Sequence, residues 1–86
     1  MKESVYEIVI ENLSNQLEDD IKITADSRLK EDLGFPSIKM IMFFTAVTKK
    51  LNISIMDFTD YELINIETVN DVTVLLTQKL QKNEQN

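Results

Sequence analysis

The sequence contains no cysteine and no histidine. Without cysteine the chain can form no disulfide, and without either residue it lacks the ligands of the common zinc and iron–sulfur sites. Nucleophilic catalysis by a cysteine–histidine or serine–histidine–aspartate set is excluded too, because the base is missing. Nothing marks a carboxylate pair for acid–base chemistry. We therefore expect no catalytic residues and no metal site, and the chain is not predicted to be an enzyme.

Glycine and proline are also scarce, with one of each, Gly34 and Pro36. A single glycine cannot supply a glycine-rich phosphate loop, so neither a dinucleotide-binding fingerprint nor a Walker A motif is possible. Taken alone, Gly34 indicates a turn and Pro36 a helix start with a preset φ angle.

The charge balance is acidic, with a formal net charge of −6 over 86 residues. Such a surface disfavours nucleic acid and anionic membranes as partners. No apolar run is long enough to span a membrane, and the opening residues MKESVYEI lack the apolar segment of a signal peptide. We expect a cytoplasmic protein without membrane insertion, and a monomer, since no coiled-coil heptads occur.

Apolar residues recur at helical spacing in three segments. They predict main helices over residues 4–17, 37–51 and 68–82, and a short fourth helix is expected over residues 59–64. The predicted fold class is all-α: a four-helix bundle with three main helices, one short helix and a long first loop.

The remaining segments connect these helices or follow them. Residues 18–36 are expected to form the long loop, a length that is typical of functional loops in small domains. Four apolar residues are expected to attach it to the core: Ile21, Ile23, Leu29 and Leu33. Residues 53–55 are expected to be an extended linker. Residues 1–82 should form one domain, followed by a disordered tail over 83–86.

Three helix starts carry a capping box, in which two backbone donors are satisfied by reciprocal side-chain hydrogen bonds. The pairs are Ser4 and Glu7, Thr59 and Glu62, and Thr68 and Asp71. The helix after Pro36 has no such pair, because Met40 stands three residues after Ser37. The Ser37 hydroxyl by itself could still cap this helix.

Residues 31–38, EDLGFPSI, resemble the phosphopantetheine attachment motif of acyl and peptidyl carrier proteins, D-L-G-x-D-S-L. The resemblance extends over nearly the whole chain. Residues 23–29 (ITADSRL) look like the loop before that motif, and the apolar helix after Ser37 fits the family's second helix. Residues 52–55 (NISI) and 67–72 (ETVNDV) fit its third loop and last helix. The all-α bundle predicted above is the fold that this resemblance implies.

The resemblance implies a function and a cofactor as well. Ser37 would carry a covalent 4'-phosphopantetheine arm, supported by Gly34, Phe35 and Pro36, and the arm's thiol would hold an acyl or aminoacyl group as a thioester. The implied partners are a phosphopantetheinyl transferase and acyl- or aminoacyl-loading and condensing enzymes. Independently of the family, a helix N-terminus favours a phosphate through its free N–H groups and dipole.

Two features depart from the family. Pro36 stands where acyl carriers usually have aspartate and peptidyl carriers often have histidine, which favours a broad-specificity transferase over the fatty-acid type. The predicted helix 37–51 carries three lysines and no carboxylate, whereas fatty-acid carriers are usually acidic there. Such a helix should repel the basic patches of fatty-acid enzymes. We therefore expect a dedicated pathway, such as polyketide or nonribosomal peptide synthesis.

The predicted partner-binding residues lie on this helix: Ile38, Lys39, Ile41, Met42 and Lys49. Helical spacing makes Phe43, Phe44 and Val47 the better core candidates. Adjacent residues cannot both point fully inward, so at least one of Ile41, Met42 and Phe43 is expected to be exposed.

Other interpretations of the same residues stay open. Ser37 can be a plain helix cap, and the lysines a solvated face. The chain can be a degenerate carrier fold that is never modified and serves as a protein–protein interaction module. It can also be an unrelated helical regulator whose loop matches the motif by chance. Modification of Ser37 separates the carrier from both alternatives.

Overall fold

The structure is a computed structural model in which the described residues are 4–17 and 21–84, with side chains described as far as residue 81. The described residues form four helices and one turn of 3-10 helix. They are α1 (Val5–Gln16), α2 (Ser37–Leu51), the 3-10 turn η1 (Ile55–Asp57), α3 (Asp60–Ile64) and α4 (Val69–Glu84). Within these residues no strand occurs, and the predicted all-α class is confirmed.

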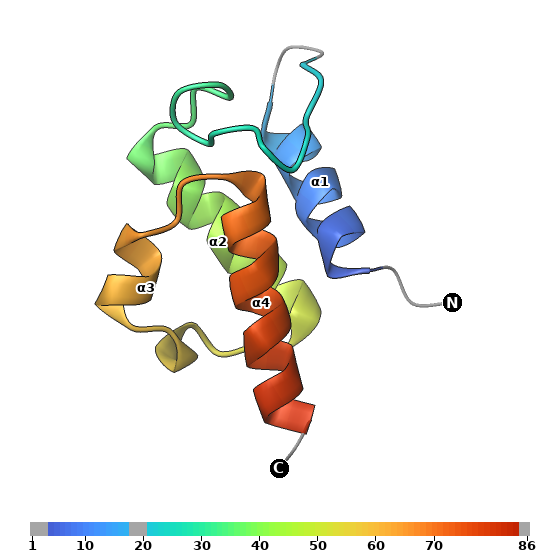
Figure 1. Ribbon diagram of the computed structural model, residues 1–86, viewed down its shortest axis with the longest axis vertical. Coiled ribbons are helices and arrows are strands. Elements are labelled where there is room, and N and C mark those ends of the chain that lie inside the picture. The colour runs from blue at the N-terminus through green and yellow to red at the C-terminus, as the bar shows by residue number, and fades with distance from the viewer. Residues whose placement is uncertain (1–3, 18–20, 85–86) are drawn as a thin grey trace.

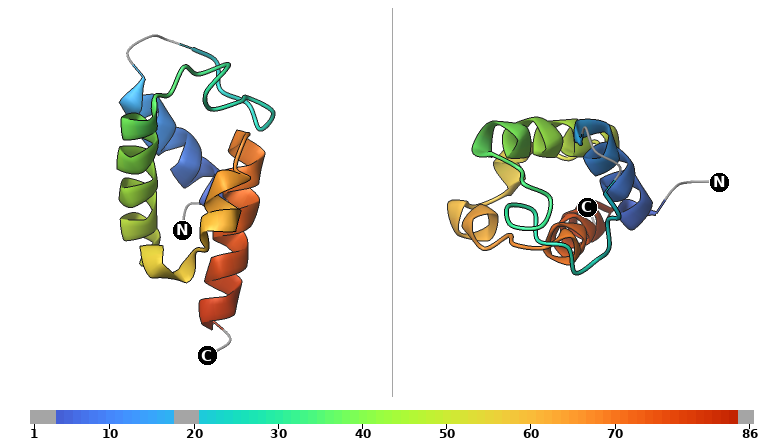
Figure 2. Two further views of the ribbon diagram at one scale, coloured as in Figure 1. Left: turned by 90° about the vertical axis from the view of Figure 1, so that its left-hand side faces the viewer. Right: turned by 90° about the horizontal axis from the view of Figure 1, so that it is seen from above.

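The three long helices surround one core, and α1 packs against both α2 and α4. In Figure 1, α2 and α4 run in one direction and α1 runs in the other. The first loop crosses the end of the bundle where α2 and α4 begin, and α3 lies on the far side from α1 (Figure 2). The first loop and the starts of α2 and α4 therefore meet at one end of the molecule, and α3 lies along its side.

The core is built from one face of each long helix and from the loops. Its fully or nearly fully buried apolar residues are Ile8, Val9, Leu13, Leu29, Leu33, Phe35, Phe43, Phe44, Val47, Ile53, Phe58, Val69, Val72, Leu75 and Leu76. The helical spacing predicted the α1 members of this set and all α4 members except Leu75, because a 3.6-residue period places them on one stripe. The three predicted capping boxes are all present, at the starts of α1, α3 and α4.

The adjacent residues Phe43 and Phe44 are both buried, at 0% and 7% exposure, so the expectation that they could not both point inward is wrong. Each has a separate aromatic partner. The Phe43 ring meets that of Phe35 from the first loop, with centroids 6.2 Å apart and planes at 75°. The Phe44 ring meets that of Phe58 at 4.9 Å and 73°. The loop and the segment after η1 thus widen the buried face of α2.

The first loop is attached to the core more selectively than predicted. Leu29 and Leu33 are buried and Ile23 is partly buried against the core, as expected. Ile21 is exposed, so its predicted role as an anchor is wrong. Residues 18–20 lie outside the described residues.

Two further segments differ from the predictions. Ile53 is buried and Ser54 is extended, but Ile55 begins η1, which the Ser54 hydroxyl caps by accepting from the Met56 N–H at 3.1 Å. The prediction of an extended linker over residues 53–55 is therefore wrong for Ile55. Of the predicted tail 83–86, residues 83 and 84 belong to α4, and 85 and 86 lie outside the described residues.

Replacement of Phe43 by alanine should lower the free energy of unfolding by about 3–5 kcal/mol, because it removes a fully buried ring and leaves a cavity. Urea unfolding followed by far-ultraviolet circular dichroism measures the change. Met42→Ala is the matched control on the same helix, since Met42 is half exposed, and it should cost less than about 1 kcal/mol. Equal losses in the two variants would contradict this description of the core.

Candidate functional site

Ser37 is the first residue of α2, and Pro36 is its N-cap. The Pro36 backbone is extended, with φ −72° and ψ 165°, and its carbonyl accepts the first bond of the helix from the Met40 N–H at 3.1 Å. The interpretation of Ser37 as the helix cap is therefore wrong, because it stands one residue too far into the helix. Its side chain is exposed, and its hydroxyl has no hydrogen-bond partner among the described residues.

The two residues before Pro36 explain why Ser37 lies at the surface. Gly34 has a φ of +65°, a left-handed conformation that side-chain-bearing residues rarely adopt. No atom lies within 4 Å of where its Cβ would be, so the turn requires glycine for its backbone angle and not for space. Phe35 then enters the core, and its N–H donates to the Leu29 carbonyl at 3.0 Å. Ser37 is thus exposed directly beside a buried anchor.

Backbone hydrogen bonds hold the loop against the start of α4. The Leu29 N–H donates to the Glu67 carbonyl at 3.0 Å, and the Val69 N–H donates to the Ser27 carbonyl at 3.0 Å. The Asn70 N–H donates to the Ala25 carbonyl at 2.9 Å. The last two donors belong to the first turn of α4, whose N–H groups have no partner within the helix. The loop therefore supplies acceptors for the first N–H groups of α4, and α4 in turn holds the loop in position.

Arg28 closes the loop with its own side chain. Its guanidinium donates to both carboxylate oxygens of Asp32, at 3.1 and 3.2 Å, and also pairs with Glu31. The backbone N–H of Arg28 donates to Asp32 as well, at 2.8 Å. These hydrogen bonds, first from the guanidinium and then from the N–H, hold the pKa of Asp32 below its usual value.

The electrostatic surroundings of Ser37 favour an anion. The first turn of α2 contains no acidic residue. Its backbone N–H groups precede the first intrahelical hydrogen bond, and the positive end of the helix dipole lies there. A phosphate attached to Ser37 would meet these groups, so the residues present fit a phosphodiester at this position.

Three adjoining hollows lie between the first loop, α2 and α3. The one that contains Ser37, the serine hollow, has a volume of about 360 Å³. It is lined by Lys30, Ser37, Met40, Ile41, Leu63, Ile64 and Ile66. Lys30 is the one charged residue in this set. The other two hollows share residues with it and extend from it in two directions.

The first extension, the apolar branch, runs along α2 toward η1 and has a volume of about 340 Å³. Its lining is Met40, Ile41, Phe44, Thr45, Ile55, Leu63 and Ile66. Within the part of the chain that the structure describes, no charged side chain lines this branch. The apolar branch therefore offers a surface on which a hydrocarbon group loses water contact without leaving a charge unpaired.

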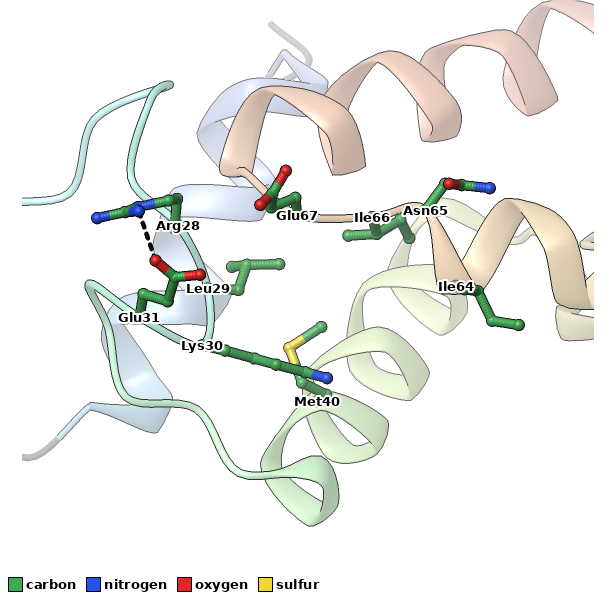
Figure 3. A pocket seen from close by; sticks show the side chains of 9 residues that line it. All are labelled: Arg28, Leu29, Lys30, Glu31, Met40, Ile64, Asn65, Ile66 and Glu67. Atoms are coloured by element: carbon green, nitrogen blue, oxygen red, sulfur yellow. Dashed lines mark ion pairs between the residues drawn. The ribbon is translucent and has the colours of Figure 1, made fainter.

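The second extension, the polar branch, runs toward the start of α4 and has a volume of about 280 Å³. Its lining is Arg28, Leu29, Lys30, Glu31, Met40, Ile64, Asn65, Ile66 and Glu67. Figure 3 shows Lys30 extending from the loop across Met40 of α2, while Arg28 and Glu31 pair on the other side. Met40, Ile66 and Lys30 line this branch and were not singled out as site residues from the sequence.

The α3 wall of these hollows is held by few contacts. Neither η1 nor α3 contains a buried residue. An ion pair of 3.0 Å joins Glu62 on α3 to Lys79 on α4, and the Lys79 ammonium lies 5.5 Å from the centre of the Phe58 ring. Leu63 is only partly buried against the core.

The five predicted partner-binding residues differ in how exposed they are. Ile38, Ile41 and Met42 are 66%, 63% and 52% exposed, and they form an apolar stripe along α2 that ends near the exposed Lys49. This confirms the expectation that at least one of Ile41, Met42 and Phe43 is exposed. Lys39 is different, because it is partly buried and donates to the Gln16 carbonyl at 3.2 Å. It places a cation at the C-terminal end of α1, whose last turn has no basic residue of its own.

Among the described residues, no group of three or more acidic side chains is placed to hold a metal ion. No helix in residues 4–17 or 21–84 is both long and apolar enough to cross a membrane. Neither observation adds a second site to the one around Ser37.

The long first loop, the three main helices and the short α3 define a small helical carrier domain. No family model matches the sequence. Two curated relatives do match, each over 75 residues that cover 86% of this chain and 95% of the relative. One is an acyl carrier protein of Onion yellows phytoplasma, 36% identical, and the other an acyl carrier protein of Aster yellows witches'-broom phytoplasma, 33% identical.

A solved structure agrees with these relatives. It is described as a candidate acyl carrier protein of Mycobacterium tuberculosis and superposes with a TM-score of 0.75 at 28% identity, covering 86% of this chain and 96% of the other. The chain belongs to the acyl carrier protein family, and the resemblance seen in the sequence is confirmed.

Because Asp32 has a lowered pKa in the folded protein, its ion pair with Arg28 stabilises the fold at neutral pH. This contribution should be lost as pH falls through the folded pKa, below the ordinary value of 3.8. We expect the free energy of unfolding of Asp32→Asn to fall less steeply than that of wild type between pH 5 and lower pH. Urea unfolding at a series of pH values measures this. Asp26→Asn is the control in the same loop, and a slope matching Asp32→Asn would contradict the assignment.

Proposed function

We propose that this protein carries acyl intermediates as thioesters on a 4'-phosphopantetheine arm esterified to Ser37. The observation that carries the proposal is the exposed Ser37 hydroxyl, without a partner among the described residues, at the first position of α2 and at the opening of the serine hollow. Gly34, Phe35 and Pro36 support it by turning the chain, anchoring it and starting the helix. The proposed carrier domain comprises residues 1–82 and acts as a cytoplasmic monomer.

The attachment follows the chemistry of a serine hydroxyl. Ser37 Oγ forms a bond to the pantetheine-linked phosphorus of coenzyme A, the phosphoanhydride P–O bond breaks, and adenosine 3',5'-bisphosphate leaves. The serine proton goes to a base on the phosphopantetheinyl transferase, because no base among the described residues hydrogen-bonds to the Ser37 hydroxyl. Once bound, the arm supplies a thiol on which loading and condensing enzymes assemble the thioester. The chain itself presents the serine and does no bond-making.

The apolar branch supports an acyl cargo in preference to an aminoacyl one. Its lining holds no carboxylate that could pair with the ammonium of an aminoacyl group. Burial of such an ammonium without a partner is costly, whereas burial of a hydrocarbon chain is favourable by roughly 25 cal/mol per Å². An apolar acyl group is therefore the cargo that fits this branch.

The surface of α2 supports a dedicated pathway, such as stand-alone carriage beside polyketide or nonribosomal peptide enzymes. The exposed stripe of Ile38, Ile41 and Met42 is apolar, and Lys49 continues it without a carboxylate. Lys39 is removed from this surface by its bond to Gln16. Partner enzymes should therefore bind α2 through apolar contact and not through a basic patch.

One observation favours the alternative, an unmodified carrier fold that serves as an interaction module. Pro36 supplies neither a carboxylate nor a backbone N–H beside Ser37, so a transferase that requires either one could not act.

Intact mass after co-expression with a broad-specificity phosphopantetheinyl transferase decides between the two. We expect a gain of one phosphopantetheine group in wild type and none in Ser37→Ala. A folded protein that gains nothing, even as Pro36→Asp, would contradict the attachment and favour the interaction module. Gain only in Pro36→Asp would identify Pro36 as the residue that closed the site.

The docking proposal has its own test, made on the loaded protein. Transfer of an acyl group from a purified fatty-acid acyltransferase should be slow for wild type and at least about tenfold faster for a Met42→Glu, Lys49→Glu double variant, because carboxylates attract basic docking patches. Lys22→Glu is the control, since Lys22 is an exposed residue of the loop outside this stripe. A wild-type rate equal to that of a fatty-acid carrier would refute the dedicated pathway.

A further inference from the structure

We propose that Lys30 is a positioning residue whose ammonium binds the phosphodiester on Ser37 and directs the arm toward α3. This inference rests on the proposed attachment at Ser37. Among the described residues, Lys30 is the one charged residue that lines the serine hollow, and it also lines the polar branch. A cation in a hollow that opens on the attachment hydroxyl is placed to pair with the single negative charge of a phosphodiester.

The backbone on both sides of Lys30 is held in place. Leu29 before it is buried at 1% exposure, and its N–H is bonded to the Glu67 carbonyl. Leu33 after it is buried, and its N–H donates to the Arg28 carbonyl at 3.1 Å. The side chain therefore starts from a fixed point beside α2, so pairing costs only the freedom of the side chain itself.

The two cations of this turn differ in their partners. Arg28 is engaged by Asp32 and Glu31, whereas Lys30 has no ion pair or hydrogen bond with any described residue. In Figure 3 the Lys30 side chain points away from the Arg28–Glu31 pair and across Met40. The Lys30 ammonium thus remains available to a ligand, while Arg28 is used by the fold.

Among the described residues that line the serine hollow, none is negatively charged. Pro36 carries no charge, and the first turn of α2 holds no acidic residue. Lys30 and the N–H groups of α2 are then positive elements available beside Ser37, whereas Lys39 in the same turn is bonded to the Gln16 carbonyl. Because Lys30 lines the serine hollow together with Leu63 and Ile64 of α3, its pairing with the phosphate favours a course of the arm along α3.

Lysine footprinting on the wild-type protein tests the contact without relying on variants. Apo and holo protein are treated with an amine-acetylating reagent, and the labelling of Lys30 relative to Lys22 is read by peptide mass spectrometry. Lys30 should be labelled roughly 1.5- to 5-fold less in the holo form, the range that an exposed ion pair supports. The protection should disappear in 1 M salt, where the Debye length falls to about 3 Å, because salt screens a charge pair and not a steric block.

A double-mutant cycle supplies the second readout. The change in unfolding equilibrium constant on loading is compared between wild type and Lys30→Met, with Lys22→Met as the matched control and Lys30→Arg as the rescue. We expect Lys30→Met alone to lose the coupling and Lys30→Arg to keep it. Equal labelling of apo and holo protein, protection that survives salt, or coupling no larger than that of Lys22→Met would overturn the role of Lys30 and leave the attachment intact. Absence of any mass gain would overturn the attachment and this inference together.

Discussion

The first loop is joined to the start of α4 by a short ladder of backbone hydrogen bonds, and the position of Ser37 depends on it. The ladder joins Leu29 to Glu67 and Ser27 to Val69. It satisfies donors that α4 cannot satisfy itself, so loosening the loop would also expose the helix start. With Leu29 held, Phe35 can donate to its carbonyl and enter the core, and α2 then begins two residues later with Ser37 at the surface.

The helix α2 has one face buried in the core and another that exposes an apolar stripe. Phe43 and Phe44 are both buried because the loop and the segment after η1 each bring a ring to meet them. With these two rings and Val47 filling the inward side, Ile38 and Ile41 are left on the outside. The apolar stripe on α2 is therefore a consequence of how the core is filled, and its exposure costs less than displacing a buried ring would.

The two walls of the hollows beside Ser37 have different stability. The loop wall is held by buried leucines, backbone hydrogen bonds and the Arg28–Asp32 pair. The α3 wall has no buried residue of its own and relies on Glu62 and Lys79. Such a wall belongs to the low-stability part of a fold, where local opening requires little free energy. A fixed loop wall facing a weakly held α3 wall is suited to admitting the arm that we propose for Ser37.

The sequence by itself determined the helices, their capping boxes and the family, because each depends on residues close together in the chain. Periodicity and local side-chain bonds placed α1, α2 and α4 within about two residues of their observed ends. The motif around Gly34 and Ser37 was equally local.

Only the tertiary structure decided which side chains meet across distant segments. The burial of both Phe43 and Phe44 and the bond from Lys39 to Gln16 depend on partners in other segments, and Ile21 is exposed although it is apolar. The hollows that join Lys30 to Met40 and Ile66 could not be read from spacing either, since three segments form them. A side chain's role depends on what packs against it, and that is settled only when the loop closes on α4.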